Sequence, residues 1–109
     1  MSDWITVCEE ADLVAGTGIC ALLGNEQVAI FKIRKGGDIY AISNYDPIGK
    51  ANVLSRGITG SIGENIVVAS PLYKQHFVLE TGACLEDNDL SVKTYPIRIE
   101  AGKVQLQAA

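Results

Sequence analysis

The 109-residue sequence lacks the cysteine and histidine pairs with which small proteins usually bind metals or form disulfides. Its three cysteines, Cys8, Cys20 and Cys84, are scattered without a C-x-x-C pair, and His76 is the single histidine. Structural zinc sites usually draw closely spaced pairs of ligands, and an odd set of scattered thiols is typical of a reducing compartment. We therefore expect the cysteines to be buried small apolar residues. A zinc site made of all three with His76 is the less favoured alternative.

The sequence also lacks an excess of positive charge and any long apolar run. Thirteen acidic and nine basic residues give a net charge of −4. This balance argues against nucleic acid as the main partner, because phosphate binding needs an excess of Lys and Arg on the contact face. No apolar run approaches the roughly 18 residues needed to span a bilayer, and the first residues show no secretory signal. We expect a cytoplasmic protein without a nucleic-acid or membrane partner.

Short β-strand patterns separated by turn residues run through the whole chain. Residues 4–8 alternate with a period of two, and Ala29, Phe31 and Ile33 fall on one face of the stretch 28–34. Short strands with frequent turns predict a single all-β domain over residues 1–109, a small antiparallel sandwich or barrel. The predicted strands are 4–8, 18–23, 28–34, 39–43, 66–69, 77–80, 95–99 and 104–106.

The segments between these strands carry turn and loop signals. Residues 9–13 could form one helical turn, which is too short for a firm prediction. Lys35-Gly36-Gly37-Asp38 predicts a tight hairpin turn, because glycine adopts the positive φ that such turns require. Residues 44–57 are expected to form an irregular loop, and Gly60 and Gly63 to bracket a further turn.

Two of the loops carry a family resemblance. Ser70-Pro71-Leu72-Tyr73-Lys74-Gln75-His76-Phe77 resembles the second ligand loop of Rieske domains, Cys-Pro-x-His-Gly-x-x-Phe. Tyr40-Ala41-Ile42-Ser43-Asn44-Tyr45-Asp46-Pro47-Ile48 resembles the first, in which Cys-Pro-His follows a strand. Leu54-Ser55-Arg56-Gly57 and Phe77-Val78-Leu79-Glu80-Thr81-Gly82 are similar to the motifs that follow these loops. From Trp4 to Gln107 the chain thus resembles a Rieske-type ferredoxin domain, which implies the Rieske-like [2Fe–2S] ferredoxin fold.

The resemblance breaks down at the four ligand positions. In Rieske domains two cysteines and two histidines from these loops hold the cluster. Asp46, Ile48, Ser70 and Tyr73 occupy those positions here, and none is a Rieske ligand. His76 lies three residues past a ligand position and does not restore the motif. We therefore expect a Rieske-like frame without a cluster, and no metal or cofactor in this chain.

The end of the chain narrows the resemblance further. Tyr95-Pro96-Ile97-Arg98-Ile99-Glu100, followed by Gly102, is similar to the ending of the small subunits of cytoplasmic NAD(P)H-dependent (assimilatory) nitrite reductases. In that family a large catalytic subunit carries FAD, a [4Fe–4S] cluster and sirohaem, and reduces nitrite to ammonia. The resemblance implies an accessory subunit that supports this partner and has no catalytic site of its own. A Rieske-like protein- or ligand-binding β module and a cluster-carrying ferredoxin are the alternatives.

The two loops together form the candidate partner-binding surface. We expect Ile48 and Tyr73 at its centre and Lys50, Arg56, Lys74 and His76 around them. An apolar or aromatic centre with a charged rim is the usual anatomy of a protein interface, and the basic rim would favour an acidic partner. The alternative is that the lysines are ordinary solvated loop residues. We also expect the Tyr73 hydroxyl to bond Asp46 or Ser70.

Overall fold

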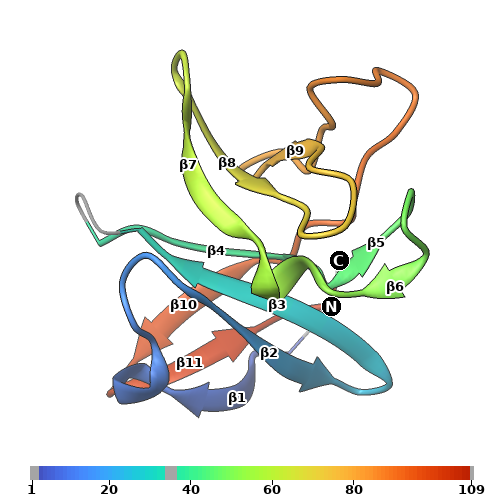
Figure 1. Ribbon diagram of the computed structural model, residues 1–109. Helices are drawn as coiled ribbons and strands as arrows, with labels where there is room; N and C mark the ends of the chain where they lie inside the picture. The colour runs from blue at the N-terminus through green and yellow to red at the C-terminus, as the bar shows by residue number, and fades with distance from the viewer. Residues whose placement is uncertain (1–2, 34–36, 109) are drawn as a thin grey trace.

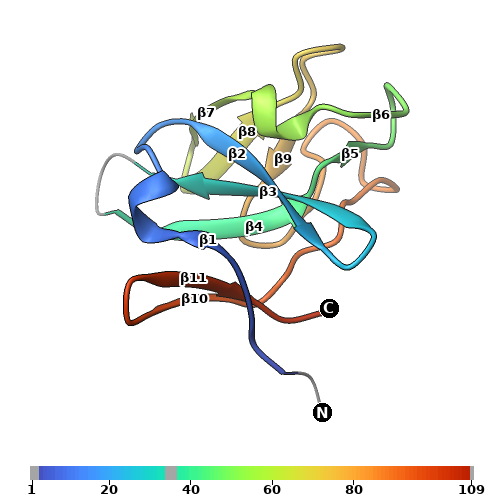
Figure 2. The ribbon, with the colours of Figure 1, turned by 90° about the horizontal axis from the view of Figure 1, so that it is seen from below.

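Three antiparallel β-sheets are stacked in layers in this computed structural model, which describes residues 3–33 and 37–108 (Figures 1 and 2). The first sheet has the order β1-β11-β10, the second β2-β3-β4 and the third β7-β8-β9. A small hairpin, β5-β6, and two single turns of 3-10 helix, η1 and η2, complete the described elements. The all-β prediction is confirmed.

The bounds of the elements are as follows. The strands are β1 (Ile5–Glu9), β2 (Gly18–Leu23), β3 (Glu26–Lys32), β4 (Ile39–Ser43), β5 (Tyr45–Asp46), β6 (Ala51–Asn52), β7 (Ile58–Ile62), β8 (Asn65–Ala69), β9 (His76–Val78), β10 (Ile97–Glu100) and β11 (Lys103–Leu106), and the 3-10 turns are η1 (Glu10–Asp12) and η2 (Leu54–Arg56).

The central strand of the middle sheet, β3, is buried on both faces, which explains its run of apolar residues. Val28 and Ile30 point to one side and pack with Val104 and Leu106 of β11. Alternate residues of β3 join the second core cluster on the other side. Because side chains alternate along a strand, a doubly covered strand must be apolar at every position. The second cluster comprises Ala29, Phe31, Ile42, Leu54, Val68, Phe77, Leu79, Cys84 and Val92.

The predicted strands occur within a residue or two of their expected bounds. Two features of the sheets differ from the prediction. β7 is an unexpected strand, because Gly60 and Ser61 have low strand propensity and Gly60 and Gly63 predict a turn. Pairing with β8 from Ile58 to Ile62 overrides that preference. In β1 the predicted strict alternation is wrong, because the register shifts between Thr6 and Cys8. This bulge lets Val7 and Cys8 both pack against the core.

Two further expectations need correction. Only Cys84 is buried; Cys8 is half-buried and Cys20 is exposed. The predicted irregular loop at 44–57 contains the β5-β6 hairpin and η2. Of the hairpin turn predicted at residues 35–38, the first two residues lie outside the described residues, and Gly37 has the expected positive φ, 70°.

Candidate functional site

The turn between β5 and β6 and the loop between β8 and β9 lie against each other. Both lie at one end of the second and third sheets, where β4 and β8 lead into them (Figure 1). We call residues 46–50 and 70–74, with Arg56 of η2, the tip. A β-carbon added at Gly49 would lie 2.3 Å from Cδ1 of Leu72, so the two loops approach closely there. The first loop is anchored by the buried Asn44, whose side chain accepts from the Ser55 backbone N–H at 2.7 Å and donates to the side chain of Gln27 at 3.1 Å.

Asp46 is the structural centre of the tip. Its residue surface is 0% exposed. One carboxylate oxygen accepts from the backbone N–H groups of Ile48 at 2.8 Å and Gly49 at 3.1 Å. The other accepts from the hydroxyl of Ser70. A buried carboxylate is costly unless such donors satisfy it, so these bonds hold the first loop in its turn and tie it to the second.

Ser70 is the matching residue of the second loop. It is buried, donates its hydroxyl to Asp46, and accepts the backbone N–H of Leu72 at 3.2 Å. The expectation that Tyr73 makes the bond to Asp46 or Ser70 is wrong, because the Tyr73 residue is 63% exposed and Ser70 itself contacts Asp46. Sequence reasoning missed this direct bond, although the resemblance placed Asp46 and Ser70 where two ligands converge on one iron atom.

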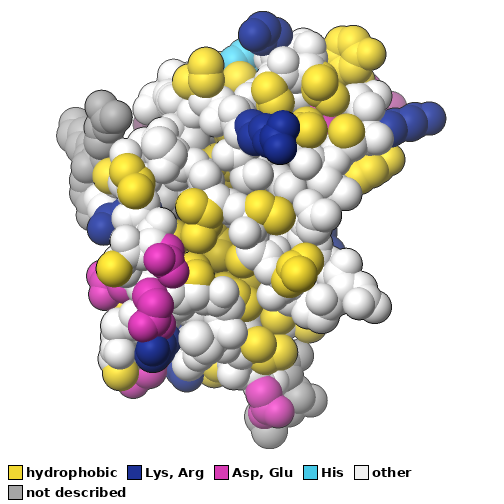
Figure 3. Space-filling view, turned by 60° about the horizontal axis from the view of Figure 1, so that its bottom comes forward, with side chains coloured by type: hydrophobic (Ala, Val, Ile, Leu, Met, Phe, Trp, Pro, Cys, Tyr) yellow, Lys and Arg dark blue, Asp and Glu magenta, His cyan; other side chains and the backbone are white. Residues whose placement is uncertain are grey.

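The other predicted contact residues are distributed around this bond. Ile48 is half-buried, while Tyr73 and its neighbour Leu72 are exposed. Lys50, Arg56 and Lys74 are exposed, and Figure 3 shows Lys and Arg side chains standing among apolar ones on the upper part of this face. Within the described parts of the chain, the ion pairs are His76–Glu86, Lys93–Glu26 and Lys103–Glu9. The three tip cations therefore have no ion-pair partner among the described side chains.

Arg56 and Lys74 both line one hollow. It has a volume of about 130 Å³ and lies between η2 and the start of the second loop. Gly57, Ile58, Ala69, Ser70 and Pro71 complete its lining. Two cationic side chains that line one small hollow offer a site that suits an anion.

His76 bonds to Glu86 rather than to residues of the tip. Its ring nitrogen Nδ1 lies 2.6 Å from Oε2 of Glu86, and its backbone N–H donates to Oε1 at 2.8 Å. The backbone bond and then the side-chain bond from His76 lower the pKa of Glu86 below its usual value. His76 lines a separate hollow along β7, not the one shared by Arg56 and Lys74.

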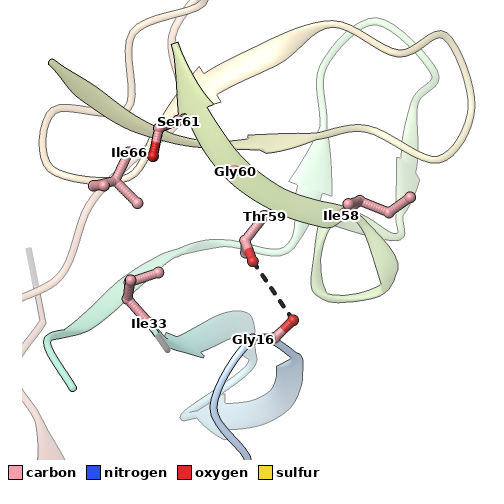
Figure 4. A pocket seen from close by; sticks show the side chains of 7 residues that line it. All are labelled: Gly16, Ile33, Ile58, Thr59, Gly60, Ser61 and Ile66. Atoms are coloured by element: carbon pink, nitrogen blue, oxygen red, sulfur yellow. Dashed lines mark hydrogen bonds between the residues drawn. The ribbon is translucent and has the colours of Figure 1, made fainter. Parts of the chain in front are cut away.

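A larger hollow, about 420 Å³, lies beside β7 (Figure 4). It opens between the third sheet and the segments around Gly16 and Ile33, and the Thr59 hydroxyl donates to the Gly16 carbonyl at 3.5 Å across it. The remaining lining residues are Ile58, Gly60, Ser61 and Ile66. Among the described residues the lining carries no titratable or thiol side chain, so the hydroxyls of Thr59 and Ser61 have no general base beside them.

The tip does not fit a Rieske cluster. Its four ligand positions present a carboxylate, an isoleucine, a hydroxyl and a phenol, and the first and third are already hydrogen-bonded to each other. Cluster iron needs thiolate and imidazole donors. Among residues 3–33 and 37–108 no group of three or more His, Cys, Asp and Glu side chains gathers as a metal site would require.

No helix in the described part of the chain is long and apolar enough to cross a membrane.

Comparison with known sequences gives a consistent set of relatives. A family described as the Rieske-like [2Fe-2S] domain matches residues 3–107. The chain is 49% identical over 107 residues to the nitrite reductase (NADH) small subunit of Salmonella typhimurium, covering 98% of this chain and 99% of that protein. It is also 39% identical over 101 residues to the nitrite reductase [NAD(P)H] large subunit of Klebsiella oxytoca, a match that spans 93% of this chain but 10% of that protein.

Solved structures agree with these matches. The crystal structure of a putative NADH-dependent nitrite reductase small subunit from Mycobacterium tuberculosis superposes with a TM-score of 0.93 at 39% identity, covering 100% of this chain and 97% of that one. The ferredoxin of carbazole 1,9a-dioxygenase from Nocardioides aromaticivorans superposes with a TM-score of 0.82 at 22% identity, over 97% of this chain and 98% of that one. The second likeness concerns the fold alone.

Proposed function

The chain belongs to the family of Rieske-like [2Fe-2S] domains, and from that premise we propose that it is the small accessory subunit of an NAD(P)H-dependent nitrite reductase. The observation that carries the proposal is the end-to-end match, at 49% identity, to a protein with that role. The reaction of such an enzyme is the reduction of nitrite to ammonia in the cytoplasm. This chain contributes no catalytic group of its own, and it supports the subunit that does.

The partner in this proposal is the large catalytic subunit, which supplies FAD, a [4Fe–4S] cluster and sirohaem. The Klebsiella oxytoca relative supports the pairing, because there a segment resembling this chain forms 10% of a large subunit. A domain that occurs both as a separate chain and as a segment of the large subunit is expected to pack against the rest of that subunit. The tip is the proposed contact surface, with Ile48, Lys50, Arg56, Tyr73 and Lys74 as its residues and His76 at its margin.

We also propose that this accessory chain holds no cluster. The hydrogen bond between Asp46 and Ser70 supports this proposal, because it replaces a metal bridge between the two loops with a direct contact. The side chain of Ile48 has no atom that can ligate iron, and Tyr73 faces solvent. The tip then supports the partner by contact and does not carry electrons.

Metal analysis tests the cluster-free state. We expect the protein, purified under anaerobic conditions and incubated with ferrous iron and sulfide, to retain neither labile sulfide nor the visible absorbance of a [2Fe–2S] centre. The Rieske-type ferredoxin of a dioxygenase, treated in parallel, is the positive control. Stoichiometric iron and sulfide in this chain would overturn the cluster-free proposal.

Affinity capture tests the subunit role. The tagged chain is used to capture proteins from its native cytoplasm, and the eluate is assayed for oxidation of NADH or NADPH that depends on nitrite. We expect a large partner with sirohaem absorbance and this activity. A capture that yields no such partner would contradict the subunit role and favour the binding-module alternative.

A further inference from the structure

We propose that the hollow between Arg56 and Lys74 binds a side-chain carboxylate of the large subunit and thereby anchors the tip to it. This inference rests on the proposed function for its partner. The site itself rests on three features of this chain: the positions of its unpaired cations, the backbone conformation at Lys74, and the shape of the hollow.

Among the described residues, Lys50, Arg56 and Lys74 at the tip have no ion-pair partner, and neither have Lys32 and Arg98 elsewhere, although the protein as a whole is acidic, with a net charge of −4. Lys93 and Lys103, which lie elsewhere, each have a glutamate partner within 2.9 Å. Arg56 and Lys74 are exposed and have no such partner among the described residues. The nearest buried carboxylate, Asp46, directs its oxygens to Ser70 and to two backbone N–H groups. These cations are therefore available to an external anion.

Lys74 occupies a backbone conformation that favours glycine. Its φ is 68°, in the left-handed region where a β-carbon is disfavoured. The Rieske loop pattern Cys-Pro-x-His-Gly has glycine at this position. Lysine here strains the backbone without gaining an intramolecular ion pair among the described residues. Positive φ also occurs at Ala101 in a plain turn, so what distinguishes Lys74 is that it combines this conformation with an unpaired charged side chain at the hollow.

The size and surroundings of the hollow limit the kind of anion that it can bind. Its volume of about 130 Å³ is too small for a nucleotide but suits the head of one side chain. Arg56 can bind both oxygens of a carboxylate, and Lys74 adds a second positive charge. Ile58, Leu72 and Tyr73 nearby are 77%, 45% and 63% exposed. Large exposed apolar side chains around two cationic ones are typical of a protein interface rather than of a site for a free small anion.

The decisive variant is Lys74→Gly, because the proposal predicts opposite effects on stability and binding. Glycine relieves the positive φ, so the melting temperature of the isolated chain should rise. Loss of a charge-assisted hydrogen bond should weaken binding to the purified large subunit by roughly tenfold or more, measured as a Kd by biolayer interferometry. Arg56→Gln should weaken binding to a similar extent. Lys74→Arg keeps the charge and should retain a Kd near that of the wild type.

Ala101→Gly is the matched control. Ala101 also has a positive φ, 50°, but lies in the β10–β11 turn away from the tip. The same relief of strain should raise its melting temperature and leave the Kd unchanged. If Lys74→Gly and Arg56→Gln bind the large subunit as tightly as the wild type, the carboxylate site is wrong while the subunit role stands.

A second measurement separates the site from the subunit role. The isolated chain is titrated with a tetraglutamate peptide, and separately with inorganic phosphate, while backbone amide shifts are followed by NMR. We expect the peptide to shift the backbone amides of residues 56–57, 70 and 72–74, and Arg56→Gln to abolish those shifts. Peptide binding without binding to the large subunit would overturn only the subunit role. Absence of peptide shifts at these residues, or an equal response to phosphate alone, would overturn the site as proposed.

Discussion

Asp46 and Ser70 show how individual residues can stabilise two loops that a metal holds together in related proteins. The carboxylate accepts three hydrogen bonds, two within its own loop and one from the opposite loop. Each such bond contributes about 1–3 kcal/mol because the acceptor is charged and buried. The tip is therefore held by local polar contacts, together with the packing of Leu72 against Gly49.

Ser70→Ala tests this bond at the scale of one residue. The variant leaves one oxygen of the buried Asp46 carboxylate without its donor, so we expect the free energy of unfolding to fall by about 1–3 kcal/mol. Urea denaturation should show a lower midpoint with an unchanged slope. Ser61→Ala, in the exposed part of β7, should change stability by no more than about 0.5 kcal/mol. Equal midpoints for the two variants would show that the bond does not stabilise the tip.

At the scale of elements, the segment after β9 is fixed by one tightly enclosed glycine. Gly82 has a φ of 80°, and a β-carbon there would lie 2.0 Å from the carbonyl oxygen of Val92. Its backbone N–H donates to the Val78 carbonyl at 2.7 Å, and its carbonyl accepts from the Val92 N–H at 2.8 Å. Gly82 thus joins β9 to the segment that carries Cys84 and Val92 into the second core cluster.

Gly82→Ala should therefore be strongly destabilising, by on the order of 3 kcal/mol or more, because strain in φ and a backbone clash act together. Gly63→Ala is the control with strain alone, since Gly63 has a φ of 61° in the β7–β8 turn and nothing within 4 Å of its added β-carbon. We expect it to cost about 1 kcal/mol. Thermal unfolding followed by circular dichroism compares the two, and similar losses would mean that the enclosure at Gly82 relaxes easily.

The bond between His76 and Glu86 connects β9 to the segment after it and gives stability a dependence on pH. His76 lowers the pKa of Glu86 below its ordinary value of 4.5. A carboxyl group with a lowered folded-state pKa adds stability above its unfolded pKa and loses it as the pH falls through the folded value. Stability should therefore decrease progressively below a pH of about 4.5.

Glu86→Gln should make this acid-induced loss smaller, because the variant has no proton to take up at that position. Melting temperatures between pH 7 and pH 3 measure the effect. Glu64→Gln, an exposed carboxylate in the β7–β8 turn, serves as the control and should follow the wild type. If Glu86→Gln loses stability in acid as steeply as the wild type, the pair does not contribute to the pH dependence.

At the scale of the whole molecule, charge is distributed unevenly. Three cations without an ion-pair partner in the described part of the chain, Lys50, Arg56 and Lys74, lie at the tip of a protein with a net charge of −4. A cluster of acidic side chains lies on the opposite, lower part of the face seen in Figure 3. Such an arrangement orients the molecule in the field of an acidic partner and speeds correct encounters.

The association rate with the large subunit should consequently fall as salt rises from roughly 0.05 to 0.5 M, since screening shortens the range of these charges. Stopped-flow or biolayer measurements give the rate. The double variant Arg56→Gln/Lys74→Gln should associate more slowly at low salt and depend less on salt. A wild-type rate that is independent of salt would mean that the tip charges do not guide association.

The sequence alone determined the fold class, most strand positions and the family. Alternation and turn residues are local signals, and the spacing of Pro47, Pro71 and Phe77 is legible from the sequence alone. β7 was missed because its residues form a strand only through pairing with β8. The expected bond from the Tyr73 hydroxyl to Asp46 or Ser70 is also wrong, because the sequence does not tell which way the Tyr73 side chain points from its loop.

Only the tertiary structure decided which side chains meet. It joined Asp46 to Ser70, turned Tyr73 to solvent, paired His76 with Glu86, and placed Arg56 of η2 beside Lys74 of the second loop. These contacts link residues 10 to 24 positions apart in the sequence. Local sequence patterns fix which face of a strand is apolar, whereas the direction of a loop side chain depends on the backbone of its own turn and on the packing of the neighbouring loop.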